Sequence, residues 1–265
     1  MTPRIAMIGC GKMGGALLKK WVTSNLNFDF TVFKPSPFDD QNLKNNVTHK
    51  TSIKGESSFD IIILGVKPQV MSEVIEEYRQ LVSNNTLILT IAAGLPLSWY
   101  EDKFSSTQPI IRTMPNTPVE IGKGVTIAVA NEATATQHKT WAEELFAPTG
   151  LFQWLEHEDM LTIATTISGC GPAYLFYFIE ALSKAGTNAG LPKSAAIELA
   201  RQTVIGSAAL TEAESSMNVQ ELRKNVTSKH GVTEAALNIL MDGRLEDIMT
   251  DAISAAIIRS QELSS

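Results

Sequence analysis

Cysteine, charge and long apolar segments are all scarce in this sequence. Two cysteines occur among 265 residues, too few for a disulfide framework or a cysteine-based zinc site. Charged residues make up 19%, below the roughly 25% of an average globular protein. The net charge is -6 and no block of Lys or Arg occurs, so a nucleic-acid or anionic membrane surface is not expected.

Signals for secretion, membrane insertion and metal binding are absent too. The first residues, MTPRIAMIGCG, carry one Arg and a short apolar run broken by glycines, unlike a signal peptide. The longest apolar stretches, such as residues 61–66, are too short to span a bilayer. His49, His138 and His157 have no Cys or acidic residue at metal-ligand spacing, so no metal site is expected. We therefore expect a globular protein of the cytoplasm.

Up to about residue 156, short apolar strands alternate with helical stretches. Several of the strands are nearly continuous Ile, Val and Leu runs, which is typical of a parallel sheet covered by helices on both faces. This alternation predicts an α/β fold with a doubly wound, Rossmann-like sheet. The expected strands are residues 4–8, 29–33, 60–64, 86–91, 109–113, 125–130 and 151–155, and the expected helices are residues 12–23, 69–81 and 134–146.

The strand pattern disappears after residue 157. Residues 173–189, 193–212 and 245–263 are rich in Ala and Leu and have the spacing of long helices. We expect a dinucleotide-binding domain over residues 1–157 and an all-α domain over residues 158–265. The low charge of the second half predicts that it buries surface against a second copy of the chain, and we expect Tyr174, Phe176, Tyr177 and Phe178 to serve helix packing.

The first strand leads directly into Gly9-Cys10-Gly11-Lys12-Met13-Gly14, which fits G-x-G-x-x-G. The motif follows a strand and opens a helix, as a dinucleotide site requires, and a plain turn is the alternative. Gly9 allows the tight turn, Gly11 lets backbone N–H groups approach a pyrophosphate, and Gly14 permits close packing of helix on strand.

The end of the second strand indicates which dinucleotide is bound. An acidic residue there would bind the ribose 2′-hydroxyl of NAD, but no carboxylate occurs before Asp39. Lys34 can pair with a 2′-phosphate and Ser36 can donate a hydrogen bond to it. NADPH is therefore favoured as the cofactor, with NADH possible and a solvated loop lysine as the alternative reading of Lys34.

Two further strand ends have small residues where ligands bind in open α/β sheets. They leave room for the ribose and the nicotinamide, although ordinary strand-to-helix turns would look the same. The two segments are Gly65-Val66-Lys67-Pro68 and Ala92-Ala93-Gly94.

Five short motifs, taken in their order along the chain, carry a resemblance to a known protein family. Besides the two segments above, they are Arg112-Thr113-Met114-Pro115-Asn116-Thr117-Pro118, Ser168-Gly169-Cys170-Gly171-Pro172-Ala173-Tyr174 and Val226-Thr227-Ser228-Lys229-His230-Gly231-Val232-Thr233. In these motifs the chain resembles pyrroline-5-carboxylate reductases over essentially its whole length. The resemblance implies reduction of a cyclic imine to L-proline with NAD(P)H, and intertwined homodimers or a higher homo-oligomer such as a decamer.

The resemblance also implies roles for individual residues. The cofactor contacts of the family fall on Ile8, Gly9, Cys10, Gly11, Lys12 and Met13, on Ser36 and Ser52, and on Gly65 to Pro68 and Ala92 to Gly94. Its substrate contacts fall on Asn225, Val232 and Thr233, and Glu158 resembles an acidic position near its substrate pocket. The commoner loop pattern is Ser-Pro-Gly-Gly-x-Thr, so Lys229 and His230 depart from it.

The residues of that loop suit the substrate on physical grounds. Backbone N–H groups from Gly231 to Thr233, at the start of a helix, can form an anion site for a carboxylate, and Ser228 opens the same loop. The Thr233 hydroxyl can hydrogen-bond the ring nitrogen and is our candidate catalytic group. A Thr at a helix start is often only a cap, which is the alternative.

The sequence therefore predicts an NADPH-preferring pyrroline-5-carboxylate reductase whose active site lies between its two halves. Another imine reductase, a β-hydroxyacid dehydrogenase or a non-catalytic NADP-binding protein are the alternatives. Cys10 and Cys170 are expected to fill space rather than act as nucleophiles, because nothing near Cys170 would lower its pKa.

Overall fold

The computed structural model describes residues 2–264, which form two compact units. One unit contains the residues up to Cys170 together with those from Ala256 onward, and the other contains Gly171–Ala255. Helix α6 (Asp159–Ser168) belongs with the first unit, where Leu161 packs against β7. The domain boundary expected after residue 157 stays a prediction.

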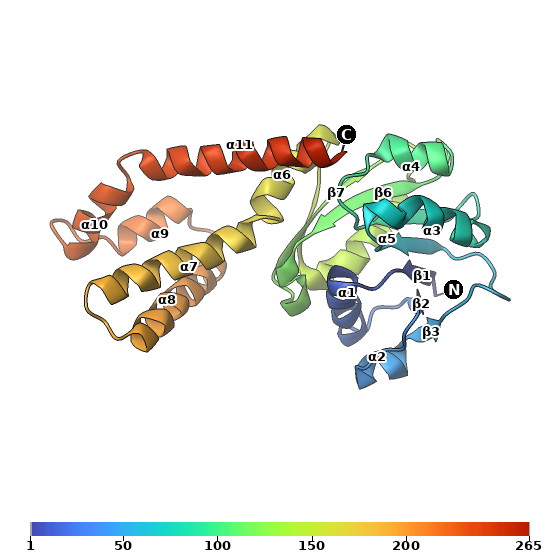
Figure 1. Cartoon of the computed structure of the whole chain (residues 1–265), viewed down its shortest axis with the longest axis horizontal. Helices are drawn as coiled ribbons and strands as arrows, with labels where there is room; N and C mark the ends of the chain where they lie inside the picture. Colours follow the sequence, from blue (N-terminus) through green and yellow to red (C-terminus); the bar gives the residue numbers. More distant parts are fainter. Residues whose placement is uncertain (1, 265) are drawn as a thin grey trace. The chain divides into compact units, whose positions relative to one another are not determined.

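The first unit is built on one sheet with the strand order β3-β2-β1-β4-β5-β6-β7-β8. Figure 1 labels β1, β2, β3, β6 and β7 of this sheet. The order reverses between β1 and β4, and ligands of doubly wound sheets bind at such a switch point. The strands are β1 (Arg4–Ile8), β2 (Asp29–Phe33), β3 (Thr48–Lys50), β4 (Ile61–Leu64), β5 (Leu87–Thr90), β6 (Ile110–Pro115), β7 (Gly124–Ala130) and β8 (Gly150–Trp154). The predicted doubly wound sheet is confirmed.

The sheet is parallel except at one position. All paired strands are parallel except β6 and β7, which run antiparallel. The chain between them holds only the short 3₁₀ helix η3 (Thr117–Ile121). A parallel pair needs a crossover of about a dozen residues or more, so this short connection forces β7 to return beside β6.

Helices cover both faces of the sheet, and the alternation of side chains along each strand decides which face they bury. In β1, Ile5 and Met7 join one core cluster with the helices α1 and α5, whereas Ala6 and Ile8 join another with α3 and α4. All four side chains are at most 2% exposed. These helices are α1 (Lys12–Thr23), α3 (Met71–Tyr78), α4 (Leu97–Lys103) and α5 (Thr136–Phe146).

Two short elements between β2 and β4, one helix and one strand, were not predicted from the sequence. Helix α2 (Gln41–Asn46) is capped by Asp40, whose side chain accepts hydrogen bonds from Asn42 N and Leu43 N. Strand β3 has three residues, too few to show a period.

The 3₁₀ helices η1 (Pro68–Val70) and η2 (Arg79–Leu81) flank α3, so the helix expected over residues 69–81 is split. A further 3₁₀ helix, η4 (Ala147–Thr149), follows α5.

The second unit is entirely helical, as predicted. It contains α7 (Gly171–Asn188), α8 (Lys193–Ala213), α9 (Val219–Asn225), α10 (Val232–Leu240) and most of α11 (Arg244–Ser264). Within Gly171–Ala255, which the structure describes throughout, the buried hydrophobic residues are Ala196 and Ala200.

Three of the four aromatic residues of α7 are exposed in the single chain. Phe176 is 60% exposed, Tyr177 71% and Phe178 48%, so the expected helix packing of these three side chains does not occur within the chain, whereas Tyr174 is half-buried. A helical unit that buries two alanines leaves most of its apolar surface uncovered.

Among residues 2–264, no helix combines the length and the apolar composition needed to cross a bilayer. The same range holds no group of three or more His, Cys, Asp or Glu side chains arranged to bind a metal ion.

Candidate active site

The glycine loop after β1 is held between the ends of two neighbouring strands. Gly9 N donates to Phe33 O of β2 at 3.4 Å, and Gly65 N, after β4, donates to Ile8 O at 2.8 Å. Gly9 has φ +82°, and a Cβ there would lie 2.4 Å from Val66 Cγ1. A Cβ on Gly65 would lie 2.6 Å from Gly9 O. Both positions therefore require glycine, because a side chain would separate the two strand ends.

The start of helix α1 is open to a ligand. Gly11 is its N-cap residue, and no side chain caps the helix there. A Cβ on Gly11 would meet nothing within 4 Å, so the space beside its backbone is open. The first N–H groups of a helix have no partner within it, and the helix dipole adds positive potential. A pyrophosphate fits this end of α1, where Lys12, Met13 and Gly14 follow.

Cys10 lies between the two glycines and is half-buried. Burial raises the pKa of its thiol above the usual value, and the nearby Lys34 opposes this shift only in part. The thiol therefore stays protonated at neutral pH and puts no negative charge beside a phosphate. The expectation of a space-filling Cys10 rather than a nucleophile fits these surroundings.

A groove of about 810 Å³ runs from the glycine loop along the ends of β1, β2 and β4. Seven of the predicted cofactor residues line it: Ile8, Gly9, Cys10, Gly11, Lys34, Ser36 and Val66. Its other lining residues, which the sequence did not indicate, are Phe33, Pro35, Thr51, Val74, Glu77 and Tyr78. A volume of this size lies within the range of roughly 300–1,000 Å³ that is usual for small-molecule sites.

No pattern in the sequence predicted that Tyr78 and Glu77 would line the groove. They lie at the end of α3, where the helical spacing indicates only a core face. The Tyr78 ring packs edge-on against Phe33, with centroids 5.3 Å apart. Burial, followed by the charge of Glu77, raises the pKa of Tyr78, so its hydroxyl remains a hydrogen-bond donor at neutral pH.

Lys34 is placed where its charge can reach a ligand in the groove. Its Nζ lies 4.6 Å from the centroid of the Phe38 ring and 3.5 Å from Pro37 O, with no carboxylate paired to it among residues 2–264. Ser36 lines the same groove. Ser52 does not line it, and its hydroxyl accepts a hydrogen bond from Lys54 N at 3.2 Å, whereas the preceding residue, Thr51, lies on the groove wall.

The remaining predicted cofactor residues follow β4 and β5. Lys67 and Pro68 lead into η1 after the groove residue Val66. Ala92 is buried, and its N–H donates to Thr90 Oγ1 at 3.2 Å. Ala93 is exposed, and Gly94 lines a second cavity of about 490 Å³ in the same unit.

This second cavity contains an ion pair that the sequence analysis recognised only in part. Glu158 lines it, and its Oε1 accepts from Arg112 and from Leu97 N, the latter at 2.8 Å. The side chain of Glu158 is 29% exposed and that of Arg112 is 12% exposed, so the ion pair is largely sheltered from water. Arg112 was noted as part of a motif but not as a site residue. Glu158 thus fixes the start of α4 to β6 at the rim of this cavity.

Apart from Glu158, the predicted substrate residues lie in the helical unit, around the start of α10. Asn225 ends α9 and its Nδ2 contacts Met217 Sδ at 3.3 Å. Gly231 N donates to Ser228 O at 2.9 Å, which closes a turn before the helix. Gly231 is the N-cap residue of α10, and no side chain caps it. Thr233 is therefore not a helix cap, and Val232 beside it is 90% exposed.

His230 keeps a glycine-like backbone in this loop. It stands at a glycine position of the family's loop pattern and has φ +60°, in the left-handed region. Its N–H donates to Glu234 Oε2 at 2.6 Å, and its Nδ1 lies 3.9 Å from the same oxygen. A non-glycine residue in this conformation carries strain, and the carboxylate of Glu234 offsets it. The loop that departs from the family pattern thus keeps a glycine-like turn.

Comparison with known proteins identifies the family. A model described as "Pyrroline-5-carboxylate reductase dimerisation" matches residues 158–263, and one described as "NADP oxidoreductase coenzyme F420-dependent" matches residues 4–94. The pyrroline-5-carboxylate reductase of Vibrio alginolyticus is 31% identical over 98% of this chain and 97% of its own. The chain belongs to the pyrroline-5-carboxylate reductase family.

Solved structures of this family have the same fold along their whole length. The pyrroline-5-carboxylate reductase of Coxiella burnetii is 31% identical, with a TM-score of 0.91 and full coverage of both chains. The Plasmodium falciparum pyrroline carboxylate reductase, whose structure has NADP bound, is 29% identical with a TM-score of 0.82 over 99% of this chain and 98% of its own. The resemblance inferred from the motifs is confirmed, and among the alternative functions the comparisons support pyrroline-5-carboxylate reductase.

The turn before α10 provides a test of the Glu234 contact. We expect Glu234→Ala to lower Tm by about 2–4 °C, because it removes one hydrogen bond and one favourable charge at a helix start. His230→Gly should leave Tm nearly unchanged, since glycine adopts positive φ freely. Glu246→Ala, in the first turn of α11, is the control for the charge alone. Equal losses in Glu234→Ala and Glu246→Ala would contradict a role for the hydrogen bond.

Proposed function

We propose that this chain reduces 1-pyrroline-5-carboxylate to L-proline, the last step of proline biosynthesis, with NADPH as the hydride donor and NADH as a weaker one. As a family member it is an NAD(P)H-dependent oxidoreductase. The observation that carries the proposal is the open helix start at Gly11, facing a nucleotide-sized groove in a chain of this family. We further propose that the enzyme acts in the cytoplasm.

The glycine loop and the neighbouring strand ends would hold the cofactor. The N–H groups after Gly11 would bind its pyrophosphate, and Lys34 with Ser36 would bind the 2′-phosphate. The segments 65–68 and 92–94 would leave room for the ribose and the nicotinamide. When bound, the nicotinamide supplies the hydride, and the chain's task is to orient the two reactants.

The loop before α10 would hold the imine. N–H groups from Gly231 to Thr233 would bind the substrate carboxylate, with Ser228 and Asn225 beside them. The Thr233 hydroxyl, which caps nothing, would hydrogen-bond the ring nitrogen. A protonated imine is already electrophilic, so no strong acid is required of the chain. Glu158 remains a candidate for substrate contact at the cavity beside Gly94, although Arg112 already neutralises it.

The decisive experiment follows NADPH oxidation with 1-pyrroline-5-carboxylate as the substrate. We expect imine-dependent oxidation by the wild-type protein and a roughly five- to hundredfold lower kcat/KM for Thr233→Val, which keeps the shape but removes the hydroxyl. NADPH binding by this variant should barely change. Folded wild-type protein without imine-dependent oxidation would overturn the proposed function, and unchanged kcat/KM in Thr233→Val would remove only the role of Thr233.

Cofactor choice is tested at the end of β2. Replacing Lys34 and Ser36 with Ala should weaken NADPH binding by about tenfold or more and NADH binding much less, because only NADPH carries the 2′-phosphate. Titration of each cofactor into the wild-type and the double variant measures the difference. Parallel losses for both cofactors would show that these side chains do not recognise the phosphate.

Assembly follows from the uncovered helical unit. The match to the family's dimerisation model supports homo-oligomerisation, and we propose at least a homodimer, with higher assemblies such as a decamer built from it. The exposed side chains of Phe176, Tyr177 and Phe178 are candidates for the buried surface. Light scattering at micromolar concentration should give a mass of at least twice the 28.8 kDa of the chain. A monomeric mass would reject the proposal.

A further inference from the structure

The backbone of Lys34 is held by the edge strand β3. Lys34 N donates to Lys50 O at 3.1 Å, and Lys34 O lies 2.9 Å from His49 Nε2. Both polar backbone groups of this residue therefore depend on the position of β3. Thr51, which directly follows β3, lines the same groove as Lys34 and Ser36.

Few backbone hydrogen bonds to other strands hold β3 in this position. It has three residues, it is the last strand of the sheet, and it pairs only with β2. The segment that follows, residues 51–59, contains neither helix nor strand. A short edge strand of this kind frays easily unless side chains anchor it.

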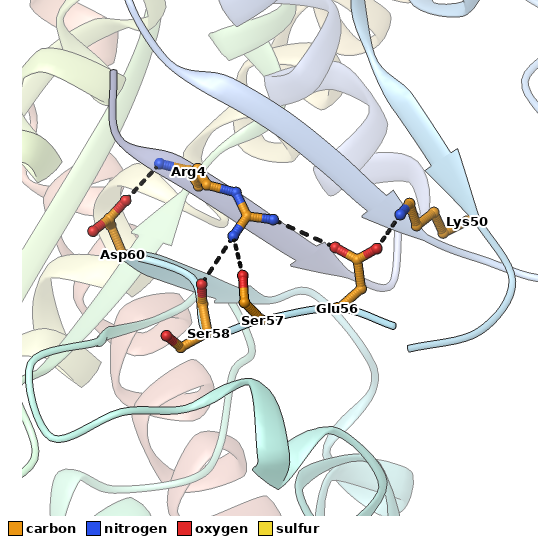
Figure 2. Close-up of polar contacts among 6 residues, drawn as sticks. All are labelled: Arg4, Lys50, Glu56, Ser57, Ser58 and Asp60. Carbon is orange, nitrogen blue, oxygen red and sulfur yellow. Dashed lines mark hydrogen bonds and ion pairs between the residues drawn. The ribbon is translucent and has the colours of Figure 1, made fainter. Parts of the chain in front are cut away.

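The carboxylate of Glu56 supplies that anchor (Figure 2). One oxygen, Oε1, contacts Lys50 Nζ at the end of β3, and the other, Oε2, lies 3.4 Å from Arg4 Nη2 at the start of β1. The Glu56 side chain is 8% exposed, whereas its two basic partners are 36% and 37% exposed. A buried carboxylate between two cations thus joins the edge of the sheet to its centre.

Arg4 is fixed independently of this carboxylate. Its Nη1 donates to Ser57 Oγ at 2.7 Å and to Ser58 O at 3.1 Å, and its backbone N donates to Asp60 Oδ2 at 2.8 Å (Figure 2). Its guanidinium also lies 4.4 Å from the centroid of the Phe59 ring. Lys50 has no second carboxylate partner among residues 2–264, so its ion pair depends on Glu56.

From these contacts we infer that Glu56 is a positioning residue for the cofactor's 2′-phosphate: through Lys50 and β3 it holds the loop that carries Lys34 and Ser36. This inference rests on the proposed cofactor site. Loss of the carboxylate leaves two cations facing each other without a counter-charge, which favours movement of the β3 end away from Arg4. That movement would shift Lys34, whereas the pyrophosphate site at α1 rests on other strands.

The experiment compares NADPH and NADH in Glu56→Gln and in Lys50→Gln. Each variant should raise the Kd and the KM for NADPH by about three- to tenfold, the range for one lost hydrogen-bonding contact, and change the values for NADH by about twofold at most. The double variant should show no further loss, because both substitutions break one connection. Lys50→Gln keeps the contact of Glu56 with Arg4, so it tests the inference even if Glu56→Gln fails to fold.

Glu143→Gln is the matched control. Glu143 is another carboxylate of this unit that accepts a hydrogen bond, from Trp154 Nε1 at 2.7 Å, and it does not line the groove. The Glu143→Gln variant should have the same preference for NADPH over NADH as the wild type.

The outcomes separate this inference from the proposal on which it rests. A fall in Tm with unchanged NADPH preference in both variants, or equal changes for both cofactors, would reduce Glu56 to a structural role and overturn the inference alone. A wild-type protein that binds NADPH and NADH equally would overturn the proposed cofactor preference and the inference with it. Lack of imine turnover with normal cofactor preference would count only against the proposed function.

Discussion

The close approach of two backbone segments at the switch point of the sheet is the constraint on which the cofactor site depends. Gly9 and Gly65 have no room for a Cβ, so the ends of β1 and β4 meet directly and the chain turns into α1 with its first N–H groups exposed. Gly11 puts no side chain into the groove beside them, so the space at the helix start is open. The proposed nucleotide site therefore depends on three glycines rather than on a reactive side chain.

The two units differ in how they are stabilised. The sheet unit buries its strands between helices, whereas the helical unit buries two alanines of its own and leaves aromatic side chains of α7 exposed. Burial of apolar surface is the main source of stability, and the match to the family's dimerisation model supports homo-oligomerisation through this part of the chain. The proposed cofactor residues thus lie in a unit with its own core, and the proposed substrate loop lies in the unit whose apolar surface is exposed in the single chain.

Carboxylates beside the proposed binding loops hold nearby segments of the backbone in place through hydrogen bonds and ion pairs. Glu234 accepts the N–H of His230 in its left-handed conformation, and Glu158 joins Arg112 to the N–H of Leu97. Glu56 acts through Lys50 on the strand beside Lys34. In each case a charged side chain is satisfied within the chain and fixes a segment that a ligand would meet, which is how a loop becomes preorganised.

The sequence by itself determined the strand and helix alternation, the glycine loop, the family and most of the groove wall, because these depend on local patterns. Tertiary structure decided the rest. The antiparallel β7, the edge strand β3 and the groove residues Tyr78 and Thr51 follow from how segments meet in space, for which no local period exists. Arg112, the partner of Glu158, and Arg4, one of the two partners of Glu56, lie tens of residues away along the chain, so only folding brings those charges together.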